Sequence, residues 1–70
     1  MSIEERDKLK ALLNYWVEHN LEHGQEFKEW ADKARALGEV EVADEMLQAA
    51  QAIDRASGLL SQSLKRLEEA

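Results

Sequence analysis

Two histidines stand four residues apart in the stretch WVEHNLEHGQEF, residues 16–27. In an α-helix this spacing places His19 and His23 on successive turns of one face, where both imidazoles can reach a single metal ion. Glu26 falls within the same arc of about 60°, at about 100° per residue. Two imidazoles and a carboxylate suit Fe(II) and Zn, and Ni(II) accepts the same ligands. The stretch therefore predicts a site of His19, His23 and Glu26 for divalent Ni, Zn or Fe, with Glu22 as a hydrogen-bonding partner of the ligands.

A structural interpretation of the same stretch also stays open. Asn and His at the a and d positions of a heptad repeat are familiar polar inserts that fix register and oligomeric state. Ser57, in the second half of the chain, is close enough in the expected helix pairing to satisfy His23. Buried polar groups are usually accommodated by such partners. Under this interpretation the specificity residues of the core or of a dimer are Trp16, Asn20, His23, Phe27 and Trp30.

No catalytic arrangement emerges from these residues, so we expect no enzyme. HNLEH has the H-x-x-E-H spacing of one class of zinc peptidases, but those enzymes need a large fold and a distant third ligand. The H-E-x-x-H pattern fails because Asn20 stands where the glutamate is required. The Glu-x-x-His pairs of di-iron bundles are also missing, since Trp16 and Asn20 precede the two histidines by three residues.

Length and charge exclude several other classes. Seventy residues form one domain at most, and a chain without cysteine has neither disulfides nor a thiolate metal site. The formal net charge is −6, and the basic residues are scattered among acidic ones, which argues against nucleic acid and against an anionic membrane as partners. No signal peptide or membrane-spanning run is expected, and the absence of cysteine fits the cytoplasm.

The placement of the histidines depends on the helices that carry them. Along the chain, apolar and aromatic residues, with Asn20 and His23 in phase, recur in steps of four and three, as in a coiled coil. We predict an all-α antiparallel hairpin, forming a single domain over residues 1–70. Its first helix covers about residues 3–37, its turn about 38–40 and its second helix about 41–68, with Gly38 as the left-handed cap. In the first helix the repeat consists of Leu13, Asn20, Phe27 and Ala34 at a and Trp16, His23, Trp30 and Leu37 at d. In the second helix it consists of Val42, Met46, Ala49, Ile53, Ala56, Leu60, Ser63 and Leu67.

A hairpin of this size rarely buries enough apolar surface to be stable alone. Further apolar residues flank the repeat on both helices, among them Leu12, Leu21, Leu47 and Leu59. Left exposed, they would form a larger patch than a monomer normally carries. We therefore expect a homodimer of hairpins, which makes a four-helix bundle.

The run Trp16-x-Glu18-His19-Asn20-x-Glu22-His23-x-x-Glu26-Phe27-x-x-Trp30-Ala31, followed by an alanine-rich helix, resembles a family of small bacterial and archaeal helical domains of unassigned function. The resemblance covers nearly the whole chain. It implies a helical hairpin and leans towards metal handling, but it names no substrate. Two functions are therefore expected as alternatives: a homodimeric interaction or structural module, and a metal-binding or metal-delivery protein that uses His19, His23 and Glu26.

Overall fold

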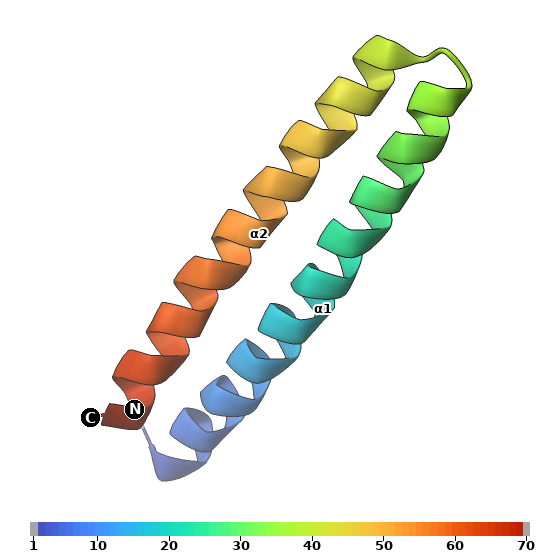
Figure 1. The fold of residues 1–70 in the computed structure, drawn as a ribbon. Coiled ribbons are helices and arrows are strands. Elements are labelled where there is room, and N and C mark those ends of the chain that lie inside the picture. The colour runs from blue at the N-terminus through green and yellow to red at the C-terminus, as the bar shows by residue number, and fades with distance from the viewer. Residues whose placement is uncertain (1, 70) are drawn as a thin grey trace.

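Two long antiparallel helices form the structure. The computed structural model describes residues 2–69, with α1 at Ile3–Ala36 and α2 at Val40–Glu69. The helices lie side by side over their whole length, so the start of α1 is beside the end of α2 (Figure 1). The hairpin measures 52 × 14 × 14 Å between its Cα extremes. The all-α antiparallel hairpin predicted from the heptad pattern is thus confirmed.

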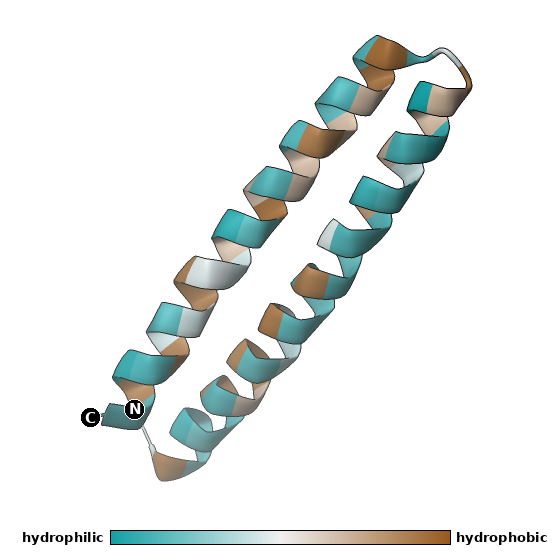
Figure 2. Ribbon diagram, viewed as in Figure 1, coloured by the Kyte–Doolittle hydropathy of each residue, from teal (hydrophilic) through white to brown (hydrophobic). Residues whose placement is uncertain are grey.

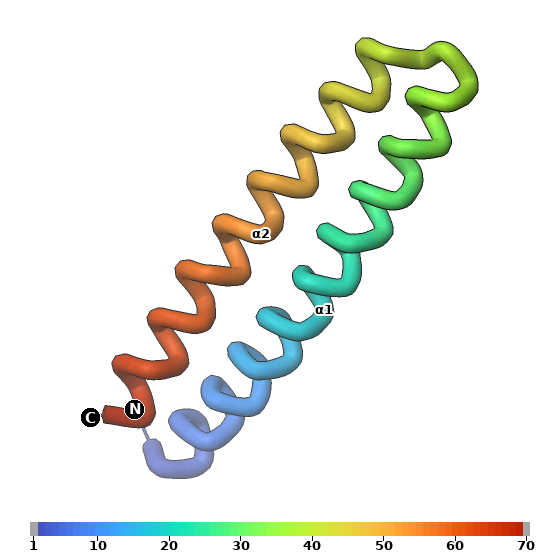
Figure 3. Tube along the Cα trace, viewed as in Figure 1, coloured from blue at the N-terminus to red at the C-terminus, as the bar shows by residue number. Residues whose placement is uncertain are grey.

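Local sequence explains where α1 begins and why it continues. The Ser2 hydroxyl accepts a hydrogen bond from the Glu5 backbone N–H at 3.1 Å, and the acidic Glu4 and Glu5 lie at the positive end of the helix dipole. Gly24 does not interrupt the helix, and the tube in Figure 3 keeps a regular coil along α1. The histidines therefore lie near the middle of one uninterrupted helix.

The turn is built around Gly38, whose φ of 88° is in the left-handed region that favours glycine. The N–H of Gly38 donates to the Arg35 carbonyl at 3.0 Å, and that of Glu39 donates to the Ala34 carbonyl at 2.9 Å. These two bonds make a Schellman motif, which satisfies carbonyls at the end of α1. The predicted role of Gly38 as a left-handed cap is confirmed.

The line of closest contact between the helices differs from the predicted d positions by one residue. On α1 the buried residues are Leu13, Gly24 and Ala31, and on α2 they are Ala43, Ala50 and Ser57. The predicted d residues Trp16, His23 and Trp30 precede Val17, Gly24 and Ala31 by one position and lie beside the contact line. Trp16 is 39% exposed and Trp30 is 57% exposed, so neither indole fills the core of the single hairpin. Of the two roles predicted for them, in the core or in a dimer, the first was wrong.

A correction of one residue also applies to half of the repeat predicted on α2. Ala43, Ala50, Ser57 and Leu64 are more buried than Val42, Ala49, Ala56 and Ser63, which make up half of the predicted repeat. The other half, Met46, Ile53, Leu60 and Leu67, is half-buried as predicted. Leu37, a predicted d residue in the turn, is 80% exposed. The distance between packed helices depends on the side chains at the contact, and small residues allow the closest approach. On α1 the large side chains of Trp16 and Trp30 therefore placed half of the repeat one residue early, whereas the a positions Leu13, Asn20, Phe27 and Ala34 do face inwards.

Apolar and polar segments alternate along both helices, as Figure 2 shows in brown and teal. Over residues 2–69 neither helix contains a stretch apolar and long enough to cross a bilayer. The sequence EVEV at residues 39–42, which has the alternation of a strand, belongs to the turn and the first residues of α2.

Candidate functional site

His19 and His23 meet through their Nε2 atoms, which lie 2.9 Å apart. The two rings are perpendicular, with an interplanar angle of 89° and centroids 4.3 Å apart. Both side chains are half-buried on the side of α1 adjoining the contact line. One Nε2 donates a hydrogen bond to the other, so one ring carries its proton on Nε2 and the other has a free lone pair there.

Glu26 lies against the opposite nitrogen of the second ring. Its Oε1 is 3.4 Å from Nδ1 of His23, whereas the contact with His19 uses Nε2. A carboxylate in this position orients an imidazole and favours a proton on Nδ1. This is the role we predicted for Glu22, and in the structure Glu26 holds it. Within residues 2–69 no group of three or more His, Cys, Asp or Glu side chains is placed to hold a metal ion.

The histidines are the central members of a column of four rings, each one helical turn from the next. The Tyr15 ring stacks on His19 at 5.2 Å between centroids, and the Phe27 ring lies 6.1 Å from His23. The i, i+4 spacing brings such side chains together on a helix surface. Tyr15 was not singled out from the sequence, although its spacing from His19 was a sufficient signal. The column therefore places an aromatic ring on each side of the histidine pair.

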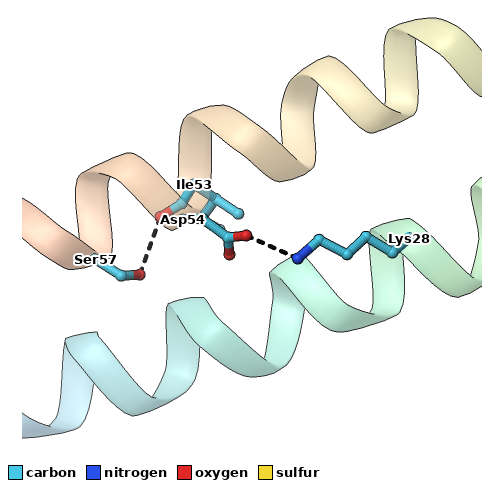
Figure 4. Close-up of polar contacts among 4 residues, drawn as sticks. All are labelled: Lys28, Ile53, Asp54 and Ser57. Carbon is cyan, nitrogen blue, oxygen red and sulfur yellow. Dashed lines mark hydrogen bonds and ion pairs between the residues drawn. The ribbon is translucent and has the colours of Figure 1, made fainter.

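The predicted partner of His23 on α2 makes a different contact. Ser57 is buried, at 2% exposure, and its hydroxyl donates to the Ile53 carbonyl of its own helix at 3.0 Å (Figure 4). The contacts of His23 are instead with His19 and Glu26 on α1. The expectation that Ser57 satisfies His23 was wrong. The histidine lies beside the hairpin core, with its side chain 39% exposed.

One long face of the hairpin is defined by residues that carry no formal charge, although the Lys33 ammonium lies over the Trp30 ring, 4.1 Å from its centroid. The residues that form this face recur every seven residues, so they share one side of each helix. From Trp16 onwards, each of them directly precedes a residue of the contact line in the sequence. We call it the uncharged face, and it consists of Leu9, Trp16, His23 and Trp30 on α1 and Val42, Ala49, Ala56 and Ser63 on α2. Its largest exposed groups are the two indole rings, one heptad on either side of His23.

The opposite long face is polar, and ion pairs bridge it. We call it the charged face; it consists of Asp7, Asn14, Leu21, Lys28 and Arg35 on α1 and Leu47, Asp54, Ser61 and Glu68 on α2. Lys28 Nζ lies 2.8 Å from Asp54 Oδ2, as Figure 4 shows, and Arg35 pairs with Asp44 at 2.6 Å. These contacts tie the two helices together on this side. The two faces of the same hairpin therefore differ sharply in chemistry.

The fold and the residues on these faces define a small helical-hairpin domain. Residues 9–67 match the model of the family described as Domain of unknown function (DUF8180), and the chain belongs to that family. The match agrees with the resemblance to a small domain of unassigned function. Neither the curated proteins nor the solved structures include a match to the chain.

Proposed function

We propose that this protein is a homodimeric helical interaction module, in which the uncharged faces of two hairpins pack together into a four-helix bundle. The observation that carries the proposal is the uncharged face itself. In a chain of which 34% of residues are charged, eight positions on one side of two helices include no Asp, Glu, Lys or Arg. Depletion of charge together with enriched aromatic residues marks the centre of a protein interface.

The accessible surface of the single hairpin supports a second copy as the occupant of this face. The hairpin exposes 5398 Å². A compact monomer of its mass, 8.0 kDa, exposes about 4,450 Å². The excess is about 900 Å², close to the ~800 Å² that each partner buries in a standard specific interface.

The dimensions of the face agree with this estimate. A side measuring 52 Å by 14 Å has an area of about 700 Å² before side chains widen it. The hairpin core is thin by comparison, because its buried apolar residues are one leucine and three alanines, at positions 13, 31, 43 and 50. Helices in proteins gain most of their stability from the burial of an apolar face. A second layer of helices would therefore add the buried apolar surface that a single pair of helices lacks.

A matched pair of charge substitutions tests the proposal. Trp30 on the uncharged face and Leu21 on the charged face are 57% and 50% exposed, so either can become glutamate without entering the hairpin core. We expect wild type and Leu21→Glu to sediment as dimers and Trp30→Glu to sediment as a monomer, because a carboxylate buried without a partner in an apolar interface is strongly disfavoured. Circular dichroism reports whether each variant keeps its helices. A monomeric wild type, or equal dissociation of both variants, would overturn the proposal.

A further inference from the structure

We infer that His19 and His23 form half of a transition-metal site that a second copy of the chain completes, giving four imidazole ligands to one Zn²⁺ or Ni²⁺ ion per dimer. The inference rests on the proposed homodimer, because one chain supplies only two convergent nitrogens. It also departs from the ligand set expected from the sequence, since Glu26 acts on Nδ1 of His23 and is not a ligand.

The separation of the two Nε2 atoms matches that of a chelating pair. Imidazole nitrogens bind Zn²⁺ at about 2.0–2.1 Å, so two ligands at an angle between 90° and tetrahedral are about 2.9–3.3 Å apart. The observed distance, across which the two rings are hydrogen-bonded, is 2.9 Å, at the 90° end of this range. A tetrahedral ion therefore requires the two nitrogens to separate by about 0.4 Å. The rings are also held from both sides, by Tyr15 at 5.2 Å from His19 and by Phe27 at 6.1 Å from His23. A pair restrained in this way loses little conformational entropy when it binds an ion.

The proton balance at the pair is simple. The Glu26 carboxylate, 3.4 Å from Nδ1 of His23, favours the tautomer with its proton on Nδ1. In that tautomer the Nε2 lone pair of His23 accepts a hydrogen bond from Nε2–H of His19 in the absence of metal. Metal binding requires both lone pairs, so His19 gives up its Nε2 proton to solvent and takes one up at Nδ1. No net proton is released from neutral imidazoles.

Symmetry supplies the remaining ligands. The histidines lie about halfway along α1, which is Ile3–Ala36, and His23 belongs to the uncharged face. In the dimer we infer, the two-fold axis lies in the plane of the packed faces, perpendicular to the helices and near the middle of α1, so that α1 packs on α1 of the second copy. It therefore brings the histidine pairs of the two chains towards each other, between the tryptophans one heptad away on either side.

The donor set selects the class of metal. Four neutral imidazoles, with no carboxylate and no thiolate, suit Zn²⁺ and Ni²⁺, whereas Ca²⁺ and Mg²⁺ prefer oxygen ligands. Fe²⁺ binds nitrogen ligands more weakly than either in the Irving–Williams order. The inferred four-imidazole ligand set therefore favours Zn²⁺ and Ni²⁺ over Fe²⁺ among the three metals expected from the sequence.

Native mass spectrometry with added ZnCl₂ or NiCl₂, on protein produced without a histidine tag, reports oligomer and metal count together. We expect a dimer carrying one ion. A dimer that takes up no ion would overturn this inference and leave the proposed dimer intact. A monomer, with or without an ion, would overturn both, and one ion per chain in a dimer would overturn the shared site.

Substitutions then test each role by isothermal titration with the same salts. Loss of a residue that orients a metal ligand typically lowers metal affinity by roughly 10–100-fold. His19→Gln and His23→Gln each remove a ligand, so each should lower the affinity for Zn²⁺ or Ni²⁺ by more than that. Glu26→Gln should lower it about 10-fold, and Glu22→Gln, the same change one turn earlier on α1, should leave it unchanged. Equal effects of the two glutamate variants would overturn the assignment of Glu26.

X-ray absorption of the zinc-loaded wild-type dimer is independent of any variant's folding. Four nitrogen neighbours at about 2.0 Å, with the outer scattering of imidazole rings, are expected. Carboxylate oxygens in the first shell would contradict the four-imidazole site.

Discussion

Replacing Gly58 and Gly24 by alanine, one at a time, makes the same chemical change in the interiors of α2 and α1. Alanine is favoured over glycine inside a helix by about 1 kcal/mol. At Gly58 a Cβ atom would meet nothing within 4 Å. Gly58→Ala should therefore raise the free energy of unfolding by close to that full amount.

At Gly24 the same gain is opposed by the neighbouring helix. A Cβ there would lie 2.5 Å from Asp54 Oδ1 and 3.2 Å from Ile53 Cγ2. The carboxylate must rotate away from its 2.8 Å contact with Lys28, an exposed type of ion pair that contributes up to about 1 kcal/mol. Ile53 must also shift slightly. Gly24→Ala should therefore change the free energy of unfolding by about zero, which leaves a difference of about 1 kcal/mol between the two variants.

Urea unfolding followed by circular dichroism, at one fixed protein concentration, measures this difference. In thermal unfolding it corresponds to roughly 4–8 °C for a domain of this size. Removing the obstructing carboxylate with Asp54→Ala should restore part of the gain at Gly24, as a double-mutant cycle would show. Equal stabilisation by Gly24→Ala and Gly58→Ala in the wild-type background would refute the close helix approach at Gly24.

Three further predictions concern the contact line and the helix ends. Ala50→Leu should destabilise the fold by about 2 kcal/mol because the buried site has no room, whereas the exposed Ala11→Leu should change stability by less than about 0.5 kcal/mol in the same urea titration. Gly38→Ala should cost about 1 kcal/mol because φ is positive there, and Gly38→Asn should cost less in the same assay. Ser2→Ala should lower the melting temperature through a cap loss of about 0.5–1 kcal/mol, and equal melting of this variant and wild type would contradict the capping bond.

The sequence was sufficient to predict the two helices, the turn between them and their antiparallel arrangement. The capping pattern at Ser2, the glycine at position 38 and the unbroken repeat across Gly24 each have a local cause, and the structure shows each of them. Local signals of this kind do not depend on how the helices are rotated against each other.

The rotation of the helices was the part that the sequence did not determine. Hydrophobic size favoured Trp16 and Trp30 as core residues, but close packing selects small residues such as Gly24 and Ala31 for the contact line. A shift of one residue moves the tryptophans and His23 to the side of the hairpin. The role of Glu26 was also not predictable from the sequence. Helix periodicity places its carboxylate near the His23 ring but does not say which ring nitrogen the carboxylate reaches.

The central claim, that the uncharged face is covered by a second copy, is tested most directly by thiol alkylation. The chain has no cysteine, and Ser63 on the uncharged face and Ser61 on the charged face are both exposed in the single hairpin. At concentrations where the protein is dimeric, the thiol of Ser63→Cys should react with a maleimide several-fold more slowly than that of Ser61→Cys. Adding Trp30→Glu should make the two rates equal. Equal rates without that substitution, at every protein concentration, would contradict the account.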